Sequence, residues 1–362
     1  MKWNIAALKP LLRDRMTSLV PALGMSAAGS EANGWTWAQW QRGVIYPRNP
    51  TRVDNHPGSF AIWVGKDCGW KDYATGEQGD VFDLVAYCLG LSDREAIAWV
   101  KHFCGIEPGK QPPKPRRRDI DPAEAAAKEA EALQKKRRQA LGMWLAVPPG
   151  LRGTLAEVYF RVRRGIELSE VKPPLQALRF SPRQWFRDAG DYRDEGAYWP
   201  ALIALMSGAD GRPVGTHRTF LARDGSDKAP YRYPRKMWPA LSGTGAHVRI
   251  SKGESGLTPE QAIANGLVET LLMAEGVDDG VALARAYPRA RIWSWGSLAL
   301  LAEMPILPSF DSYILFADND QHNPQAMELF ERGRKRLADS GAMVEVVRSP
   351  LGKDISDLVR LA

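Results

Sequence analysis

The sequence predicts an α/β fold, in which a carboxy-terminal domain with a parallel sheet flanked by helices follows a mixed α+β basic subdomain and a small amino-terminal domain. Short apolar runs alternate with helical patterns in the last third of the chain, as they do in sheets covered by helices. Two of these runs, residues 271–274 and 313–317, end abruptly in acidic residues. Because ligands gather at the carboxyl ends of parallel strands, we expect the functional site at these two ends.

Four parts are expected along the 362 residues. They are a small amino-terminal domain (1–107), a proline-rich and basic linker with a helix (108–145), a basic subdomain (146–245) and the carboxy-terminal domain (246–362). No apolar run is long enough to cross a membrane, and residues 1–15 lack the apolar core of a signal peptide. The three cysteines form no pair at metal-ligand spacing. We therefore expect a cytoplasmic protein without a membrane partner.

The amino-terminal domain is predicted to contain a hairpin and two capped helices. Residues 56–64 predict a turn and a strand, and residues 69–73 predict a second strand. Asp80 is a suitable N-cap for the helix that follows. Ser92 and Glu95 have the spacing of a capping box at the start of the next helix.

This order of elements resembles the zinc-ribbon module at the front of bacterial and phage primases. That module has a Cys-x-x-Cys pair before its glycine turn, whereas this chain has Asp72 and Thr75 there. Tetrahedral zinc needs four ligands, and Cys68 and His56 alone cannot supply them. We expect a ribbon-like fold without zinc, held by its tryptophan and phenylalanine core. This amino-terminal domain could contact single-stranded template, or it could serve for packing without nucleic-acid contact. Both roles stay open.

Basic residues are concentrated in the linker. The net charge of +7 favours association with a polyanion. Arginines occupy residues 116–118, and a helix that Asp121 caps is predicted over residues 120–145. A second basic run, residues 135–138, is expected at the carboxy-terminal end of this helix, where positive charge is stabilising. Both basic runs suit either contact with phosphates or a solvated surface.

The remaining elements follow in order. A helix capped by Thr154 precedes a hairpin of two apolar strands, 201–206 and 214–221, joined by an Ala-Asp-Gly turn. The carboxy-terminal domain is predicted to contain strands 247–250, 270–274, 291–295, 313–317 and 343–347, and helices 259–264, 281–286, 298–302, 325–339 and 355–361.

Both acidic strand ends carry more than one carboxylate. Glu275 and Asp279 follow the first strand, and Asp318 and Asp320 follow the second. Carboxylates that converge repel one another unless a hard cation neutralises them, so we expect Mg²⁺ or Mn²⁺. Gly276 lets the chain turn tightly and a substrate approach closely. If only one of the two acidic clusters is considered, its residues could instead cap the helix that follows, and this is the alternative to a metal site.

A strand that ends in Glu-Gly-x-x-Asp, followed by one that ends in Asp-x-Asp, resembles the Toprim domain of bacterial-type primases, topoisomerases and some nucleases. The resemblance implies that Asp318 and Asp320, supported by Asp279, hold one or two Mg²⁺ ions that bridge a triphosphate and activate the attacking 3′ oxygen. Glu275 would act as general acid–base or as a further metal ligand, and the sequence does not choose. A Gly-Lys-Asp after the last strand matches the primase branch, where Lys353 would reach a phosphate.

The basic segment from residue 217 to residue 237 resembles the one that precedes the Toprim domain in phage and plasmid primases. The resemblance implies that Arg218, Lys228 and Lys236 bind the phosphates of template and nucleotide. Arginine and lysine suit this role as a planar fork and a point charge. Ordinary surface cations on a hairpin are the alternative for each residue.

Together these resemblances imply a phage- or plasmid-type DNA primase, which makes short RNA primers on single-stranded DNA from ribonucleoside triphosphates in the cytoplasm of a bacterial host cell. A separate replicative helicase or replication protein is the expected protein partner. Two alternatives stay open, a Toprim nuclease that cleaves phosphodiesters and a non-catalytic DNA-binding replication accessory. The ATPase loop Gly-x-x-x-x-Gly-Lys-Ser/Thr that usually accompanies such nucleases is absent from the sequence.

Overall fold

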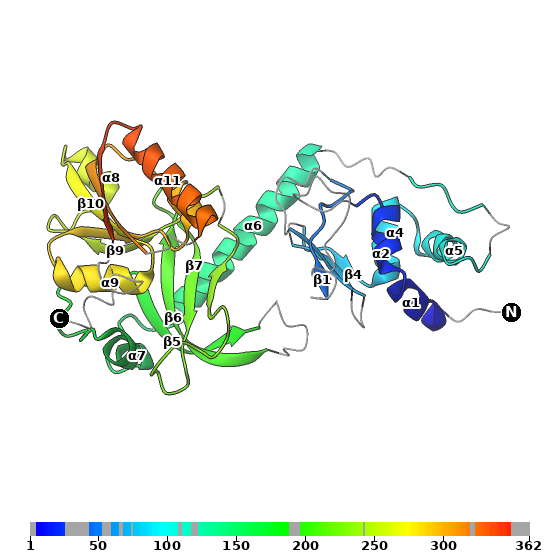
Figure 1. The fold of residues 1–362 in the computed structure, drawn as a ribbon, viewed down its shortest axis with the longest axis horizontal. Coiled ribbons are helices and arrows are strands. Elements are labelled where there is room, and N and C mark those ends of the chain that lie inside the picture. The colour runs from blue at the N-terminus through cyan, green and yellow to red at the C-terminus, as the bar shows by residue number, and fades with distance from the viewer. Residues whose placement is uncertain are drawn as a thin grey trace. The chain divides into compact units, whose positions relative to one another are not determined.

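The computed structural model of the chain divides into two compact units, each described by itself below (Figure 1). One comprises Met1–Lys135 with Ala189–Asp194, and the other comprises Lys136–Asp188 with Glu195–Ala362. The structure describes residues 5–25, 43–52, 59–64, 68–73, 75–107, 111–116, 122–187, 196–241, 243–318 and 323–348. Within these residues no helix is long and apolar enough to span a membrane.

Four short antiparallel strands form the sheet of the first unit, in the order β1–β2–β3–β4. The strands are β1 (Val44–Ile45), β2 (Phe60–Trp63), β3 (Trp70–Asp72) and β4 (Gln78–Gly79), and the helices are α1 (Ile5–Arg13), α2 (Met16–Ala22), α4 (Val81–Leu89) and α5 (Asp93–Phe103). The predicted pairing of two strands is confirmed by β2 and β3. Asp80 and Ser92 both cap their helices, each within a capping box.

An aromatic cluster lies in the core of this unit. Phe60, Trp70 and Tyr87 are all buried, with ring centroids 5.5 Å apart for Phe60 and Trp70 and 4.4 Å apart for Trp70 and Tyr87. Such close ring pairs add to the stability that burial provides. The predicted tryptophan and phenylalanine core is therefore present.

Asp72 stands where the resemblance places a zinc-binding cysteine, and it anchors a buried polar network instead. It accepts hydrogen bonds from Arg52 at 2.9 Å and from Asn49 at 2.8 Å. Asn49 also donates to the hydroxyl of Tyr87 at 2.8 Å, which links β3 to α4. In a structural zinc site the metal links segments that are distant in the sequence. Here the hydrogen bonds of Asp72 and Asn49 link such segments. His56 lies outside the described residues, and the absence of zinc stays a prediction.

The long helix α6 (Pro122–Leu145) confirms the helix predicted over residues 120–145. The predicted cap, Asp121, lies outside the described residues. The placement of the second basic run at the far end is wrong, because the helix continues past Arg138 to Leu145 and its last turn contains no basic residue.

The first sheet of the second unit has four antiparallel strands in the order β5–β6–β7–β8. They are β5 (Leu178–Phe186), β6 (Ala197–Ser207), β7 (Pro213–Phe220) and β8 (Arg235–Trp238), preceded by α7 (Leu155–Arg164). The predicted hairpin is confirmed as β6 and β7. Thr154 caps α7 by accepting a hydrogen bond from the backbone N–H of Ala156, as predicted.

The second sheet has five strands in the order β13–β12–β10–β11–β9. The elements are β9 (Val248–Lys252), α8 (Pro259–Ala264), β10 (Glu269–Ala274), α9 (Val277–Ala286), β11 (Arg291–Ser294), α10 (Leu298–Leu301), β12 (Phe310–Ala317), α11 (Pro324–Ala338) and β13 (Met343–Arg348). Four strands are parallel, as predicted, but the edge strand β9 is antiparallel to β11. The sheet is therefore mixed, because a parallel sheet can accept an antiparallel strand at its edge.

Helices cover both faces of this mixed sheet. Leu272 of β10 packs with Val281 of α9 in one core, whereas Leu271 packs with Leu337 of α11 in another. The first of these cores also contains Leu202 of β6, so the two sheets of this unit share it. Neighbouring residues of a strand point to opposite faces, which is why Leu271 and Leu272 enter different cores.

Candidate active site

The two acidic strand ends lie side by side. β10 and β12 are parallel neighbours whose register pairs Ala274 with Phe316. Glu275 follows the first strand directly and Asp318 follows the second, so both leave the same edge of the sheet. Both line one pocket, together with Asp279 from the first turn of α9. The structure therefore brings together three of the four predicted carboxylates.

The opposite side of this pocket comes from the antiparallel sheet. His217 and Thr219 of β7 and Arg235 of β8 line it. Thr219 and Arg235 are cross-strand partners, so they share one face of the sheet. The space between the walls is about 40 Å³, enough for an ion or a few waters. Carboxylates thus face a guanidinium and an imidazole across a small polar gap.

Three local features hold the start of α9 in place. Gly276 is the N-cap of the helix. A Cβ atom at this position would lie 2.5 Å from the Asp279 carboxylate, so the glycine leaves room for that carboxylate. The N–H of Gly296 donates to the Glu275 carbonyl at 2.9 Å. The Ser294 hydroxyl donates to the Gly276 carbonyl at 2.9 Å. The helix begins at Val277, four residues before its predicted start, because an acidic first turn favours a helix N-terminus.

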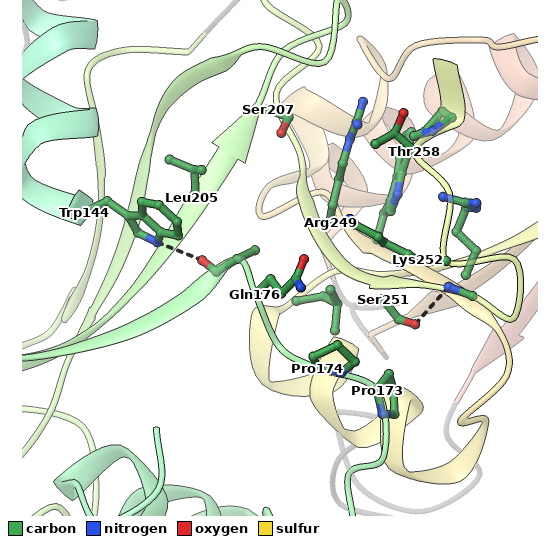
Figure 2. A pocket seen from close by; sticks show the side chains of 17 residues that line it. Trp144, Pro173, Pro174, Gln176, Leu205, Ser207, Arg249, Ser251, Lys252 and Thr258 are labelled. Atoms are coloured by element: carbon green, nitrogen blue, oxygen red, sulfur yellow. Dashed lines mark hydrogen bonds between the residues drawn. The ribbon is translucent and has the colours of Figure 1, made fainter. Parts of the chain in front are cut away.

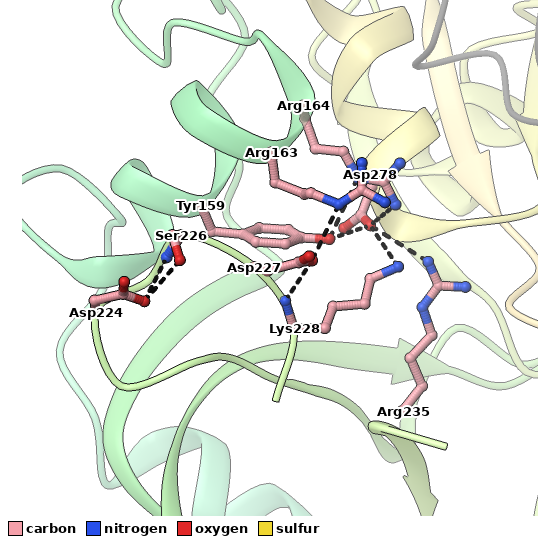
Figure 3. Close-up of polar contacts among 9 residues, drawn as sticks. All are labelled: Tyr159, Arg163, Arg164, Asp224, Ser226, Asp227, Lys228, Arg235 and Asp278. Atoms are coloured by element: carbon pink, nitrogen blue, oxygen red, sulfur yellow. Dashed lines mark hydrogen bonds and ion pairs between the residues drawn. The ribbon is translucent and has the colours of Figure 1, made fainter. Parts of the chain in front are cut away.

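Asp278 is the buried centre of an ionic network behind the pocket (Figure 3). Its Oδ2 atom accepts hydrogen bonds from Arg164 at 2.6 Å and from the Tyr159 hydroxyl at 2.8 Å. Arg235 lies 3.4 Å and Lys228 3.9 Å from the same oxygen. Three segments far apart in the sequence, residues 159–164, residues 228–235 and the start of α9, therefore meet at one carboxylate.

The neighbouring positive charges, rather than burial, decide the ionisation state of the Asp278 carboxylate. Burial by itself would raise the pKa of Asp278, but the charges of Arg164, Arg235 and Lys228 outweigh it and hold the pKa well below its usual range. Burial raises the pKa of the Tyr159 hydroxyl, and the Asp278 charge raises it further. At neutral pH the network therefore contains an ionised aspartate and a protonated tyrosine.

His217 is neutral at pH 7. Burial lowers the pKa of its imidazole to about 4, and the nearby charge of Arg235 adds to this effect. The ring therefore offers a hydrogen-bonding group to the pocket without adding positive charge.

The predicted phosphate-binding cations are divided between the two faces of the antiparallel sheet. Lys228 reaches the network behind the pocket. Arg218 and Lys236 are cross-strand partners, one residue from Thr219 and Arg235, and they face away from the pocket. Lys236 lies 5.2 Å from the centroid of the Phe186 ring on that other face. Arg235, which sequence reasoning did not select, takes the position facing the carboxylates.

Two predicted site residues, Asp320 and Lys353, lie outside the described residues, so their roles stay predictions.

One member of the missed network had a signal in the sequence. Tyr159 and Phe160 lie on the buried stripe of α7, and Arg164 continues that stripe one turn later. A charged residue at a core position needs a partner, which predicts a buried acid elsewhere. Nothing local distinguishes Asp278 from Asp279, because both belong to the acidic first turn of one helix.

The pocket offers oxygen donors for a divalent cation. Asp278 adds a buried Oδ1 atom that accepts no hydrogen bond within the described residues. No three histidine, cysteine, aspartate or glutamate side chains in the described ranges form a group that would hold a metal by themselves. Mg²⁺ commonly keeps several waters and binds through one or two carboxylates together with substrate phosphates. The donors fit Mg²⁺ held in that way.

One family model matches part of the chain. It is described as a domain of unknown function, DUF7146, and matches residues 134–249. This range includes α7 and the β5–β8 sheet and ends before Glu275. None of the curated proteins compared with the chain matches it.

Several solved primase structures are similar to the chain. A DnaG primase catalytic domain bound to single-stranded DNA is 16% identical, with 64% of this chain and 78% of that chain covered and a TM-score of 0.42. The E. coli primase catalytic core is 17% identical (62% and 75% covered, TM-score 0.38). The zinc-binding and RNA polymerase domains of Aquifex aeolicus primase are 15% identical (100% and 83% covered, TM-score 0.34). Similarity at this level assigns neither an activity nor a residue role to this chain.

Proposed function

We propose that this chain is a DNA primase, a nucleotidyltransferase that makes short RNA primers on single-stranded DNA from ribonucleoside triphosphates in phage or plasmid replication. The observation that carries the proposal is the pocket in which Glu275, Asp279 and Asp318 face Arg235 and His217. Such a reaction needs carboxylates for a divalent ion and cations for phosphates on the other side. The resemblance of both acidic motifs to the Toprim domain leads to the same reaction class.

In this proposal Glu275, Asp279 and Asp318 surround one or two Mg²⁺ or Mn²⁺ ions, each held by one or two of these carboxylates together with waters and substrate phosphates, and Asp320 is a further ligand. The bound ion would neutralise the triphosphate and activate the attacking 3′ oxygen. Glu275 has its backbone carbonyl fixed by the N–H of Gly296, which suits a residue that must keep one orientation. Its role is either general acid–base or metal ligand.

The cations of the site are proposed to hold phosphates. The side chain of Arg235 is 42% exposed, and only one of its donors is directed at Asp278. A guanidinium has five N–H donors, so the others suit an incoming phosphate. Lys228 would assist as a point charge. Asp278 acts here as a positioning residue through its Oδ2 atom, which fixes both cations, and its Oδ1 atom is left as one further donor for the ion.

The template is proposed to follow the face of the antiparallel sheet that carries Thr219. Tyr198 is on the same face, since β6 pairs Leu202 with Thr219 and side chains alternate along a strand. Tyr198 and its cross-strand partner Trp185 are about half exposed, and the Arg183 guanidinium lies 4.0 Å from the Tyr198 ring centroid. Exposed rings beside cations suit stacking of single-stranded bases.

The proposal is tested by incubating single-stranded DNA with labelled ribonucleotides and Mg²⁺. The expected product is a ladder of short oligoribonucleotides that a chelator abolishes. Glu275→Gln and Asp318→Asn should each lower the rate by about 100-fold or more while the protein stays folded. Asp311→Asn, which changes an exposed carboxylate at the start of β12, is the matched control and should keep the rate.

The same assay separates the alternatives. Cleaved DNA without primers would indicate a Toprim nuclease, and bound but unchanged DNA would indicate a non-catalytic accessory. Arg235→Gln should reduce primer synthesis more than Arg218→Gln, because only Arg235 lines the pocket. The opposite ranking would contradict the assignment of the phosphate-binding cation. A replicative helicase, the proposed protein partner, can be added to the same reaction.

A further inference from the structure

A second and larger pocket of about 420 Å³ lies elsewhere in the second unit (Figure 2). It is formed by the end of α6, the segment before β5, and residues of β6, β9 and β11. Small-molecule sites commonly have volumes of about 300–1,000 Å³. The space therefore suits a compact ligand.

This pocket is separate from the acidic one, with which it shares no lining residue. Arg291, which lines it, begins β11, whereas Ser294 ends that strand beside Ala274 and the acidic pocket. Leu205 of β6 also lines it, on the opposite face of that sheet from Ala204, the cross-strand partner of His217. A ligand in this pocket would occupy a site of its own.

One side of the pocket presents a fixed aromatic ring. The Trp144 indole N–H donates to the Ala177 carbonyl at 3.1 Å. The Arg179 guanidinium lies 3.5 Å from the ring centroid and does not line the pocket, so the ligand would meet the other face or the edge of the ring. Leu205 and Pro174 lie nearby and are apolar. A wall of this kind favours a flat, weakly polar ring.

The other side carries positive charge. Figure 2 shows Lys252 and Arg249 across the pocket from Trp144. Arg249 is paired with Glu260 at 3.0 Å, whereas the side chain of the exposed Lys252 makes no hydrogen bond or ion pair within the described part of the chain. None of the described residues that line the pocket is acidic. One unmatched cation at the edge of the pocket favours an anion such as a phosphate.

We propose that this pocket binds a nucleoside 5′-monophosphate group, with the base against Trp144 and the phosphate at Lys252. The side-chain amide of Gln176 lines the space between them and offers both a donor and an acceptor for a base edge. The hydroxyls of Ser207 and Thr258 provide further polar contacts. The group belongs either to a free mononucleotide or to the end of an oligonucleotide. The proposal does not depend on the polymerase activity.

Calorimetric titration of the full chain tests the proposal. The probes are the four ribonucleoside 5′-monophosphates, a 5′-phosphorylated trinucleotide, adenosine and inorganic phosphate. Lys252→Ala should weaken nucleotide binding about tenfold or more, because it removes a charge-assisted contact, and should leave adenosine binding unchanged. Trp144→Leu should weaken both. Glu275→Gln and the exposed control Lys335→Ala should bind as the unchanged chain does.

Two binding results support the proposal, and they distinguish a free mononucleotide from the end of an oligonucleotide. Binding of mononucleotides that depends on Lys252 indicates a free nucleotide, and binding of the trinucleotide alone with the same dependence indicates an oligonucleotide end. Failure of every nucleotide to bind at millimolar concentration would overturn it. So would binding that survives Lys252→Ala or is lost in Glu275→Gln, because the ligand would then occupy the acidic pocket. Since Lys252 is exposed, its substitution keeps the fold.

Discussion

At the scale of single residues, the site depends on two neighbouring aspartates with different tasks. Asp279 lines the pocket with the other carboxylates, whereas Asp278 also accepts Arg164 and Tyr159 in the buried network behind it. The Asp279 carboxylate is available to the reaction, whereas the Asp278 carboxylate holds Arg235 and Lys228 in position. A buried ion pair is costly to break, because the remaining partner keeps its charge without compensation.

Asp278→Asn is therefore expected to destabilise the protein by about 3–5 kcal/mol, since it removes the charge of the carboxylate that the buried Arg164 contacts at 2.6 Å. Urea denaturation measures the change. Asp227→Asn is the matched control, because the Asp227–Arg163 pair is exposed and should be worth about 0.5 kcal/mol or less. Equal losses in the two variants would show that the buried network has no special role.

Gly276→Ala is expected to lower primer synthesis with little loss of stability. The added Cβ would lie 2.5 Å from the Asp279 carboxylate, and a side-chain end can move away at small cost. The backbone at this position has φ −91°, which alanine adopts without strain. Full activity in the folded variant would show that the position of Asp279 is unimportant.

At the scale of elements, α9 delivers both aspartates, and its position depends on close packing against the mixed sheet. Gly280 faces Ser294 of β11 and Ile250 of β9, where a Cβ atom would lie 2.5 Å and 2.9 Å from their side chains. The Ser294 hydroxyl is also the donor that fixes the Gly276 carbonyl. Packing of this helix and the geometry of the loop are therefore linked.

Gly280→Ala should destabilise the protein by about 1–3 kcal/mol, although alanine is the better helix former, because the added methyl group overpacks the contact. Gly142→Ala in α6 is the control, because nothing lies within 4 Å of its added Cβ. It should stabilise by about 0.5–1 kcal/mol. Thermal denaturation of both variants measures these changes, and a stabilised Gly280→Ala would contradict the close packing.

At the scale of the second unit as a whole, two buried histidines make stability depend on pH. Burial lowers the pKa of His217 to about 4 and that of His247 to about 3. An unfolded chain binds these protons near pH 6.5. Between that pH and about 4, the unfolded state therefore holds more protons than the folded state, and stability falls as the pH falls.

The slope should be about 1.4 kcal/mol per pH unit for each histidine in this window. His217→Gln should remove one of the two contributions and flatten the curve. The free energy of unfolding, measured by urea titration from pH 7 to pH 4, checks this. An unchanged slope in the variant would mean that His217 is protonated in the folded protein.

Much of this architecture could be predicted from local patterns. The caps Asp80, Ser92 and Thr154 and the β6–β7 hairpin are where the sequence places them. The antiparallel direction of β9 could not be predicted, because periodicity shows that a strand forms but not which way its neighbour runs. The interior position of the basic run in α6 could have been predicted, because the predicted helix already ends at residue 145, well past Arg138.

By itself the sequence determined that carboxylates follow two apolar strands, because strands, caps and turns depend on residues close together in the chain. Only the tertiary structure decided that Arg235 rather than Arg218 faces those carboxylates, and that Asp278 is the aspartate with Arg164 behind it. Partners more than a hundred residues apart meet through packing, and a shift of one residue on a strand moves a side chain to the other face. No local pattern contains that information.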